Sequence, residues 1–350
     1  MRAIVFAALT GVLPACQSNA VRFSGTLLVF LLVVPSLHAQ NSADFYDRAE
    51  TALRAGKIAE AETLYARIQP GQPEYVRAQL RLGTIYYSTG RPALAEKALE
   101  KYLALEKTAE GFTLLAGAQF NLEKSDIAYK SAKQALRLDP KYAKAYTALG
   151  MIYTARKDWP DADAAYQEAL KLDAKDSGTW FLLGRSYFFR NEFEKARDAY
   201  ERSLRLNPES IRAYENLGLT LDLLNQPEAA EKAFQTGIEH NRRSPLPEAR
   251  IHIAYGNFLS KLDRLEDSRR QLEEAARIAP HNAETHFELT KLFVRMKRWK
   301  EAAQEGEAAL RVGGPDYRVH FLLSTAYTAL ADFPRASRHA KESERLAEKR

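Results

Sequence analysis

The chain repeats a pattern of 34 residues along most of its length. An aromatic residue, a Leu-Gly pair and a second aromatic residue return at fixed offsets in stretches that begin at Tyr146, Trp180 and Tyr214. Counted from the Leu-Gly pair, nine copies start near residues 42, 76, 109, 143, 177, 211, 249, 283 and 317, with one step of 33 and one of 38. Because one short unit cannot bury its apolar face alone, such a chain builds its core by stacking neighbouring units. We therefore expect one array over residues 42–350.

Each copy predicts two helices. In the fifth copy the first helix is indicated by apolar residues at i, i+3, i+4 and i+7, which are Trp180, Leu183, Gly184 and Tyr187. A short turn, RNEF, precedes the second helix, and Pro208 ends it. Two antiparallel helices approach closely only where side chains are small. We therefore expect Gly184 on the first helix to face Ala196 on the second.

The fifth copy resembles the tetratricopeptide repeat, whose pattern is W-x2-L-G-x2-Y…A-x3-F…P. Its slots are filled by Trp180, Leu183, Gly184, Tyr187, Ala196, Tyr200 and Pro208. The fourth and sixth copies meet most of the same slots. The resemblance covers residues 42–350 and implies an all-α fold, a right-handed superhelical solenoid of about nine helix-turn-helix repeats. It also implies binding of partners, usually peptide segments, along a concave groove.

Some copies depart from the pattern. Arg48 and Ala49 replace the Leu-Gly pair in the first copy, Gln119 replaces the second aromatic residue in the third, and Thr290 replaces the glycine in the eighth. The step of 38 comes from four extra residues around HNRRSPLPE, residues 240–248. We expect the array to bend or loosen near residue 243.

Composition describes a soluble folded protein. The chain has 350 residues, of which 46% are hydrophobic and 27% charged, so it does not have the composition of a disordered protein. It carries 51 basic and 45 acidic residues, a net charge of +6. Without Arg2 and Arg22, which lie in a segment that we expect to be removed, 49 basic residues remain against 45. This small excess does not favour nucleic acid as a partner.

The N-terminus carries two apolar runs, each preceded by an arginine. The second, residues 27–34, suits the core of a secretory signal and is too short to span a bilayer. We expect residues 1–39 to be a signal peptide, with cleavage after Ala39 and export to the periplasm or medium. Alternatively, the first run ends in LPAC at Cys16, which resembles the lipobox of lipoproteins, and an acylated Cys16 would anchor the protein to a membrane. Val21 is an alternative translation start; residues 1–20 would then lie upstream of the true start of the protein.

The residues give little support for catalysis. Cys16 is the only cysteine, so cleavage at Ala39 removes any thiol chemistry. His252, His286 and His320 are spaced by 34 residues, but equivalent positions in stacked helix pairs lie about 10 Å apart. One metal ion with nitrogen bonds near 2 Å does not bridge them, so we interpret them as packing histidines. No phosphate loop, HExxH or GxSxG occurs. We expect no enzyme, no metal and no cofactor.

The groove is the candidate site. In the repeat family the concave face is lined by the first helix, at slots two before the first aromatic position and one, five, eight and nine after it. In the fifth and later copies the residues that we select on this face are Phe181, Arg185, Phe188, Phe189, Arg250, Asn257, Lys261, Phe287, Lys291, Arg295, Arg318 and Phe321. Basic and aromatic residues interleave. The stripe is interpreted either as a solvated helix face or as a surface for an acidic peptide or a C-terminal carboxylate.

The sequence thus predicts a non-catalytic scaffold for protein–protein interaction. The alternatives are a lipid-anchored envelope-assembly factor and a regulatory subunit of an enzyme on another chain. The last predicted helix, from Arg335, is charged on most faces, so we interpret it as its own cap and expect a monomer. Membrane attachment is expected only if Cys16 is lipidated.

Overall fold

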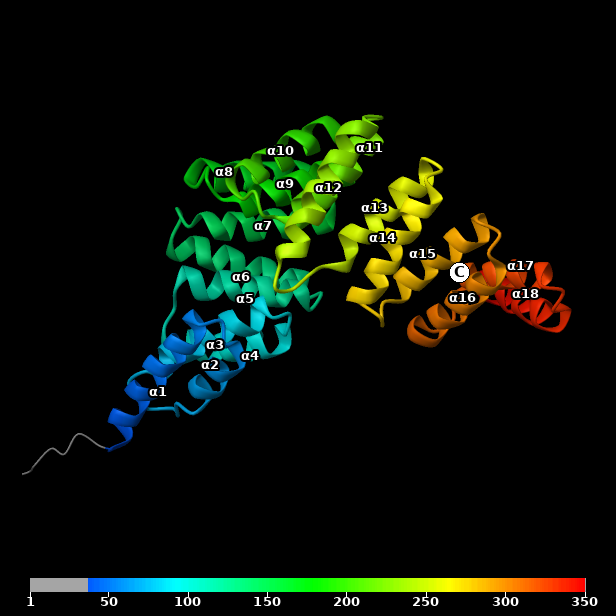
Figure 1. The fold of residues 1–350 in the computed structure, drawn as a ribbon. Coiled ribbons are helices and arrows are strands. Elements are labelled where there is room, and N and C mark those ends of the chain that lie inside the picture. Colours follow the sequence, from blue (N-terminus) through cyan, green and yellow to red (C-terminus); the bar gives the residue numbers. More distant parts are fainter. Residues whose placement is uncertain (1–36, 350) are drawn as a thin grey trace, which may run out of the picture.

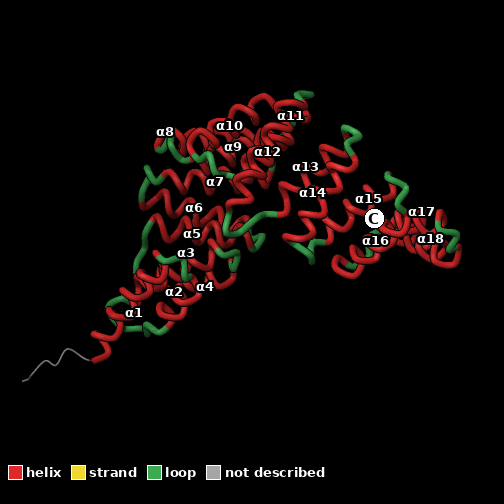
Figure 2. Tube along the Cα trace, viewed as in Figure 1, coloured by secondary structure: helices red, strands yellow, loops and turns green. Residues whose placement is uncertain are grey.

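The structure, a computed structural model, describes residues 37–349 as nine antiparallel helix pairs (Figures 1 and 2). The first helices are α1 (Leu37–Arg54), α3 (Tyr75–Ser88), α5 (Ala109–Asn121), α7 (Ala143–Arg156), α9 (Ser177–Phe189), α11 (Ile211–Leu223), α13 (Ala249–Lys261), α15 (Ala283–Arg295) and α17 (Tyr317–Ala329). The second helices are α2 (Ile58–Ala66), α4 (Pro92–Leu105), α6 (Ser125–Leu138), α8 (Trp159–Leu172), α10 (Phe193–Leu206), α12 (Pro227–Arg243), α14 (Leu265–Ile278), α16 (Trp299–Gly313) and α18 (Phe333–Ala347). The described residues contain no strand. The predicted all-α fold of about nine repeats is confirmed.

The pairs stack into an elongated, curved array whose described ends lie far apart (Figure 1). Each first helix packs against its own second helix and, from α3 on, against the second helix before it. From α3 to α17 the successive first helices also contact one another. Successive second helices make no comparable contact within residues 37–349. The first helices therefore lie on the inner, concave side of the curve.

Most of the predicted signal peptide, residues 1–39, lies outside the described residues. Helix α1 begins at Leu37, so the expected cleavage after Ala39 falls within its first turn. None of the described helices is both long and apolar enough to cross a bilayer.

Small side chains set the distance between paired helices. The alanine slot of the second helix is fully buried in seven copies, at Ala61, Ala95, Ala128, Ala162, Ala196, Ala230 and Ala302, and nearly so at Ala336. Gly184 and Ala196 are both buried, and their predicted contact stays a prediction. A Cβ on Gly184 would meet the ring of Tyr200 at 2.7 Å, one helical turn beyond Ala196. The glycine makes room for the large residue of the second helix.

The turn inside every pair uses one left-handed residue. It is always the fourteenth residue after the start of the copy, and its φ lies between 55° and 73°. The nine residues are Gly56, Gly90, Glu123, Lys157, Asn191, Asn225, Asp263, Lys297 and Ala331. Glycine, asparagine and aspartate adopt this conformation readily, whereas other side chains clash with the backbone. Four turns therefore carry residues that are strained there.

Replacing a strained turn residue by glycine is expected to stabilise the array. The left-handed region costs a residue such as Ala331 about 1–2 kcal/mol, while glycine adds about 0.4–1 kcal/mol of unfolded-state entropy. Ala331→Gly and Lys157→Gly should each raise the free energy of unfolding by about 0.5–1 kcal/mol, measured by urea titration. Asn191→Gly is the matched control and should change it less. An unchanged midpoint for Ala331→Gly would contradict the assigned turn.

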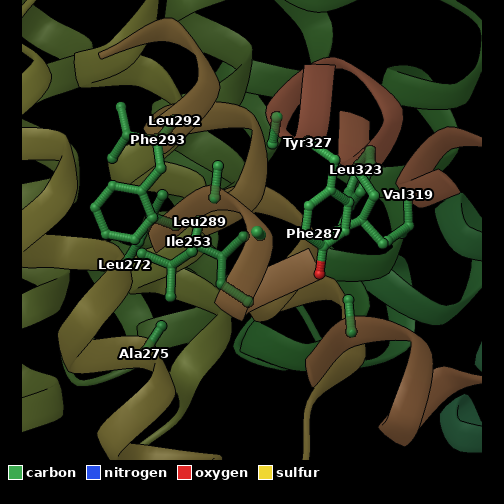
Figure 3. Packing of buried hydrophobic residues seen from close by; sticks show 14 of the residues in the cluster. Ile253, Leu272, Ala275, Phe287, Leu289, Leu292, Phe293, Val319, Leu323 and Tyr327 are labelled. Carbon is green, nitrogen blue, oxygen red and sulfur yellow. The ribbon is translucent and has the colours of Figure 1, made fainter. Parts of the chain in front are cut away.

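The core is continuous between neighbouring pairs. Figure 3 shows its C-terminal part, where Phe287 of α15 lies beside Val319 and Leu323 of α17. Residues from six helices, α13 to α18, form this one cluster. The apolar face that one pair leaves open is thus covered by the next pair, as stacking requires.

The long step between the sixth and seventh copies is bridged by packed side chains, and the bend or loosening expected near residue 243 stays a prediction. Helix α12 has 17 residues where α10 has 14, and it absorbs part of the insertion. The side chain of Asn241, which is 1% exposed, then closes the loop. Its amide donates to the carbonyl of Glu248 at 2.9 Å, and its Oδ1 accepts from the Glu248 backbone N–H at 2.7 Å. Ile251 of α13 packs in one hydrophobic cluster with residues of α10, α11 and α12, on the other side of the junction.

Candidate peptide-binding groove

An apolar pocket of about 320 Å³ opens on the concave face between α5, α7 and α9. Its walls are side chains from four consecutive first helices, Tyr87, Thr113, Leu114, Ala116, Gly117, Phe120, Lys144, Thr147, Ala148, Met151, Asp176, Gly178 and Leu182. Charged groups occur only at its edge. Lys144 is exposed, and Asp176 caps α9 by accepting from the backbone N–H of Gly178 at 3.0 Å.

A second pocket of about 130 Å³ continues the first toward the C-terminal ends of the same helices. Phe120, Met151 and Leu182 line both pockets and separate them. The other walls of the second pocket are Thr154, Ala155, Tyr166, Arg185 and Phe189. Together the two pockets form a groove, here called the central groove, along α7 and α9.

The central groove exists because small residues face it. Gly117 lets the ring of Tyr87 lie against the backbone of α5, since a Cβ there would be 2.8 Å from the ring. Burial raises the pKa of Tyr87, and burial also raises the pKa of Tyr166. Both phenols are therefore neutral across the physiological range, and the floor of the groove carries no charge.

The slots that line the central groove are those predicted for the concave face, but mostly in other copies. Thr113, Gly117 and Phe120 occupy them in the third copy, and Lys144, Thr147, Met151, Thr154 and Ala155 in the fourth. The sequence prediction selected charged and aromatic residues in the fifth and later copies. The signal that it passed over was the run of small residues, which leaves space.

The predicted cations of the later copies lie on the concave side but bond to the array itself. Across copies, Arg250 pairs with Glu215 at 2.9 Å and Lys261 with Asp222 at 2.7 Å. Three more cations have near neighbours: Lys291 with Glu288 at 2.7 Å, Arg295 with Asp263 at 3.0 Å, and Arg318 with Asp316 at 2.7 Å. Burial raises the pKa of Glu215, and Arg250 opposes this effect. The pairs of Arg250, Lys261 and Arg295 connect neighbouring repeats, whereas those of Lys291 and Arg318 are local.

The predicted aromatic residues divide between core and surface. Phe181 and Phe188 are half-buried and pack against the core of α10 to α13, and Phe287 is buried. Phe189 and Phe321 are exposed, with 56% and 63% of their surface accessible. Asn257 is half-buried. Of the twelve predicted residues, only Arg185 and Phe189 line the central groove; the functional role of all twelve stays a prediction.

A family model covers more than half of the chain. It is described as the cilia and flagella-associated protein 70 C-terminal domain, a tetratricopeptide repeat domain, and it matches residues 39–250. The chain belongs to this tetratricopeptide repeat family. No curated protein sequence matches the chain.

Solved structures share the tetratricopeptide fold at low sequence identity. PilF of Pseudomonas aeruginosa is 21% identical with a TM-score of 0.51, over 60% of this chain and 94% of that one. PilW, a type IV pilus biogenesis factor, is 19% identical with a TM-score of 0.51, over 59% and 98%. Yeast Tom70 is 16% identical with a TM-score of 0.60, over 84% of this chain and 64% of that one. At these identities the similarity shows the fold alone.

The three regularly spaced histidines occupy the first aromatic slot of the tetratricopeptide pattern, and each contacts the residue 19 positions later. His252 Nδ1 lies 2.9 Å from Gln271 Oε1, and His286 Nδ1 lies 2.7 Å from Glu305 Oε2. His320 Nδ1 lies 2.8 Å from the Nδ1 of His339. Each histidine thus bonds to its own second helix. The described residues hold no cluster of three or more His, Cys, Asp or Glu side chains suited to a metal ion.

Mild acid is expected to destabilise the array through His252 and His320. Burial lowers the pKa of His252, and burial together with the charge of His339 lowers the pKa of His320. The unfolded chain, with histidine pKa values near 6.5, therefore binds more protons than the folded one. Stability should be full above about pH 7 and fall as the pH drops below about 6.5.

The test is urea unfolding at pH 7.5 and 5.5. His320→Tyr places in this slot the aromatic residue that other copies have. The difference between the free energies of unfolding at the two pH values should therefore be smaller in this variant than in the unaltered chain. Equal stability at both pH values, or an unchanged slope in His320→Tyr, would contradict the assignment.

Proposed function

We propose that the protein is a non-catalytic scaffold that binds a segment of a partner protein in the central groove. The observation that carries this proposal is a continuous apolar groove on the concave face, lined by four consecutive first helices and filled by no side chain of the described residues. Apolar surface left open in this way is stabilised when a ligand covers it. A volume of about 320 Å³ is at the lower end of the range of about 300–1,000 Å³ for binding pockets, which suits the side chains of a peptide.

Two features favour a peptide over a folded surface. The central groove consists of two successive pockets that share three lining residues, so it suits a chain with side chains at regular intervals. The hydroxyls of Thr113 and Thr154 donate to carbonyls of their own helices at 2.8 Å, which leaves their oxygens as acceptors for the N–H groups of a peptide backbone. In the later copies the charged side chains of the concave surface form ion pairs with one another, so fewer of them are free to bind a partner.

The test is a site-specific photocrosslink. Benzoylphenylalanine at position 113 should capture a partner in the native host, and mass spectrometry of the adduct should map to one contiguous segment. Gly178→Leu places a side chain in the larger pocket, where the nearest atom to the new Cβ is Asp176 Oδ1 at 3.2 Å, and should remove the adduct. Benzoylphenylalanine at Lys133, exposed on α6, is the control. Adducts that persist in Gly178→Leu, or that form equally at position 133, would contradict the proposal.

Export is the second part of the proposal, and the apolar run at residues 27–34 before SLHA supports it. We expect a mature N-terminus at or near Gln40, found by N-terminal sequencing of the native protein. Met1 intact in the cytoplasm would contradict export. An intact mass that shows loss of residues 1–15 and acylation of Cys16 would favour the alternative, a lipid-anchored envelope-assembly factor. That alternative has some support from the fold shared with PilF and with PilW, a pilus biogenesis factor.

A regulatory subunit of a separate enzyme remains the other alternative. It binds through the same central groove, so the photocrosslink identifies it by the nature of the captured chain. The scaffold itself is proposed to act as a monomer, since α18 is charged on its outer face and buries only Ala336 and His339.

A further inference from the structure

Arg185 differs from the other cations predicted for the concave face. The other five each form an ion pair with a carboxylate of the array. Arg185 has no ion pair and no hydrogen bond with any other described residue. Its guanidinium carbon lies 5.5 Å from the ring centre of Phe189 and 6.0 Å from that of Phe181.

The surroundings of Arg185 fix the cation and leave its donors free. The side chain is half-buried beside two phenyl rings, which hold a guanidinium by cation–π attraction. Its charge also acts on the buried Tyr166, where it opposes the burial that raises the pKa of that phenol. A guanidinium has five N–H donors and no acceptor. Partial burial weakens their hydration, so a carboxylate that enters the central groove gains more here than at a fully exposed arginine.

The position of Arg185 along the central groove sets the spacing of a ligand. Arg185 lines the smaller pocket only. On α7 the larger pocket is lined between Lys144 and Met151, and the smaller one between Met151 and Ala155. With a rise of 1.5 Å per residue, the two centres lie about 9 Å apart along the helix. Alternate residues of an extended peptide point to one side at about 7 Å. The two methylene groups of a glutamate span the remaining distance to the guanidinium.

We propose that the central groove recognises an extended peptide in which a bulky apolar residue and a glutamate are separated by one residue, with the glutamate bound by Arg185. This inference rests on the proposed function, because it names the partner of the same groove. The apolar side chain fills the larger pocket beneath Leu114 and Leu182. The glutamate stem passes through the smaller pocket, and its carboxylate accepts hydrogen bonds from Arg185.

The experiment is selection of a displayed library of random peptides on four proteins: the unaltered chain, Arg185→Glu, Gly178→Leu and Arg205→Glu. Arg205 is an exposed arginine of α10 with no ion pair among the described residues, so its reversal is the matched charge control. Circular dichroism verifies that each variant is folded. We expect the unaltered chain and Arg205→Glu to enrich the same pattern, either apolar-x-acidic or acidic-x-apolar. The order that is enriched gives the direction in which the peptide lies in the central groove.

Arg185→Glu should replace the acidic preference by a basic one at the same position. For one selected peptide, glutamate to glutamine should weaken binding to the unaltered chain by at least about tenfold. Gly178→Leu should lose the bulky apolar preference.

The outcomes separate the two proposals. Peptides that are lost in Gly178→Leu but show no acidic preference overturn the role of Arg185 and leave the central groove as the site. Peptides that bind Gly178→Leu with the same affinity as the unaltered chain overturn the groove itself. Enrichment of no peptide at all also overturns it. Loss of the acidic preference in Arg205→Glu would show a general charge effect and overturn the assignment to Arg185.

Discussion

Replacing Gly184 by leucine is expected to lower the free energy of unfolding by about 1–3 kcal/mol, the usual cost of overpacking a core. A Cβ at this position would lie 2.7 Å from the ring of Tyr200, far inside van der Waals contact. Tyr200 is fully buried, so its ring has no open space to enter. The measurement is urea unfolding followed by circular dichroism at 222 nm.

A double variant tests whether the loss comes from this contact. Removing the ring in Gly184→Leu/Tyr200→Ala should make the added cost of the leucine smaller than in the presence of Tyr200, with a coupling energy of about 0.5–3 kcal/mol. Gly178→Leu, on the same helix, is the control and should be nearly neutral, because its Cβ meets only Asp176 Oδ1 within 4 Å. Equal costs of Gly184→Leu with and without the tyrosine ring would show that the two residues do not share one space.

Other copies already contain compensated versions of this contact. The third copy has alanine in both slots, at Ala116 and Ala132, and both are fully buried. In the eighth copy Thr290 takes the glycine slot, while Gly306 takes the place of the large residue of the second helix. Large and small side chains thus exchange between the two helices while the packing is kept. The sequence departure at Thr290 is therefore a paired change rather than a defect of the repeat.

The periodic part of the fold could be predicted from the sequence. A period of 34 residues, with helix signals at 3.6-residue spacing, indicates how many helix pairs there are and which residues face the core. The nearest neighbour of Gly184 was missed because periodicity gives the faces of two helices but not their relative shift along the axis. Ala196 and Tyr200 lie one turn apart on the second helix, and only packing in three dimensions shows that the Tyr200 ring lies nearest to Gly184.

The candidate site was less predictable for a related reason. The concave slots follow from the repeat, but whether a cation in such a slot is free depends on its neighbours in space. Glu215 and Arg250 are 35 residues apart, and Asp222 and Lys261 are 39 apart. Both pairs cross the step from the sixth copy to the seventh. Arg185 has no such acid in reach among the described residues, which the sequence alone does not reveal.

The second large effect on stability is expected at Asn241, in the 38-residue step between the sixth and seventh copies. Asn241→Ala should lower the free energy of unfolding by about 2–3 kcal/mol, since it removes two hydrogen bonds and leaves the N–H and C=O of the half-buried Glu248 without the partners they have now. The site is 1% exposed, so water does not readily replace the amide.

Asn241→Asp is the second variant for this junction: it keeps the acceptor for the Glu248 N–H but replaces the donor by a carboxylate oxygen that faces the Glu248 carbonyl. Because it also places a charge at a buried site, it should cost at least as much as alanine at pH 7. Urea unfolding gives the stabilities, and hydrogen exchange at the Glu248 amide reports the loop directly. Because each repeat is stabilised only by its neighbours, a weakened junction should also speed exchange at the start of α13 more than in α5. If Asn241→Ala melts like the unaltered chain with Glu248 still protected, the amide does not hold the sixth and seventh copies together.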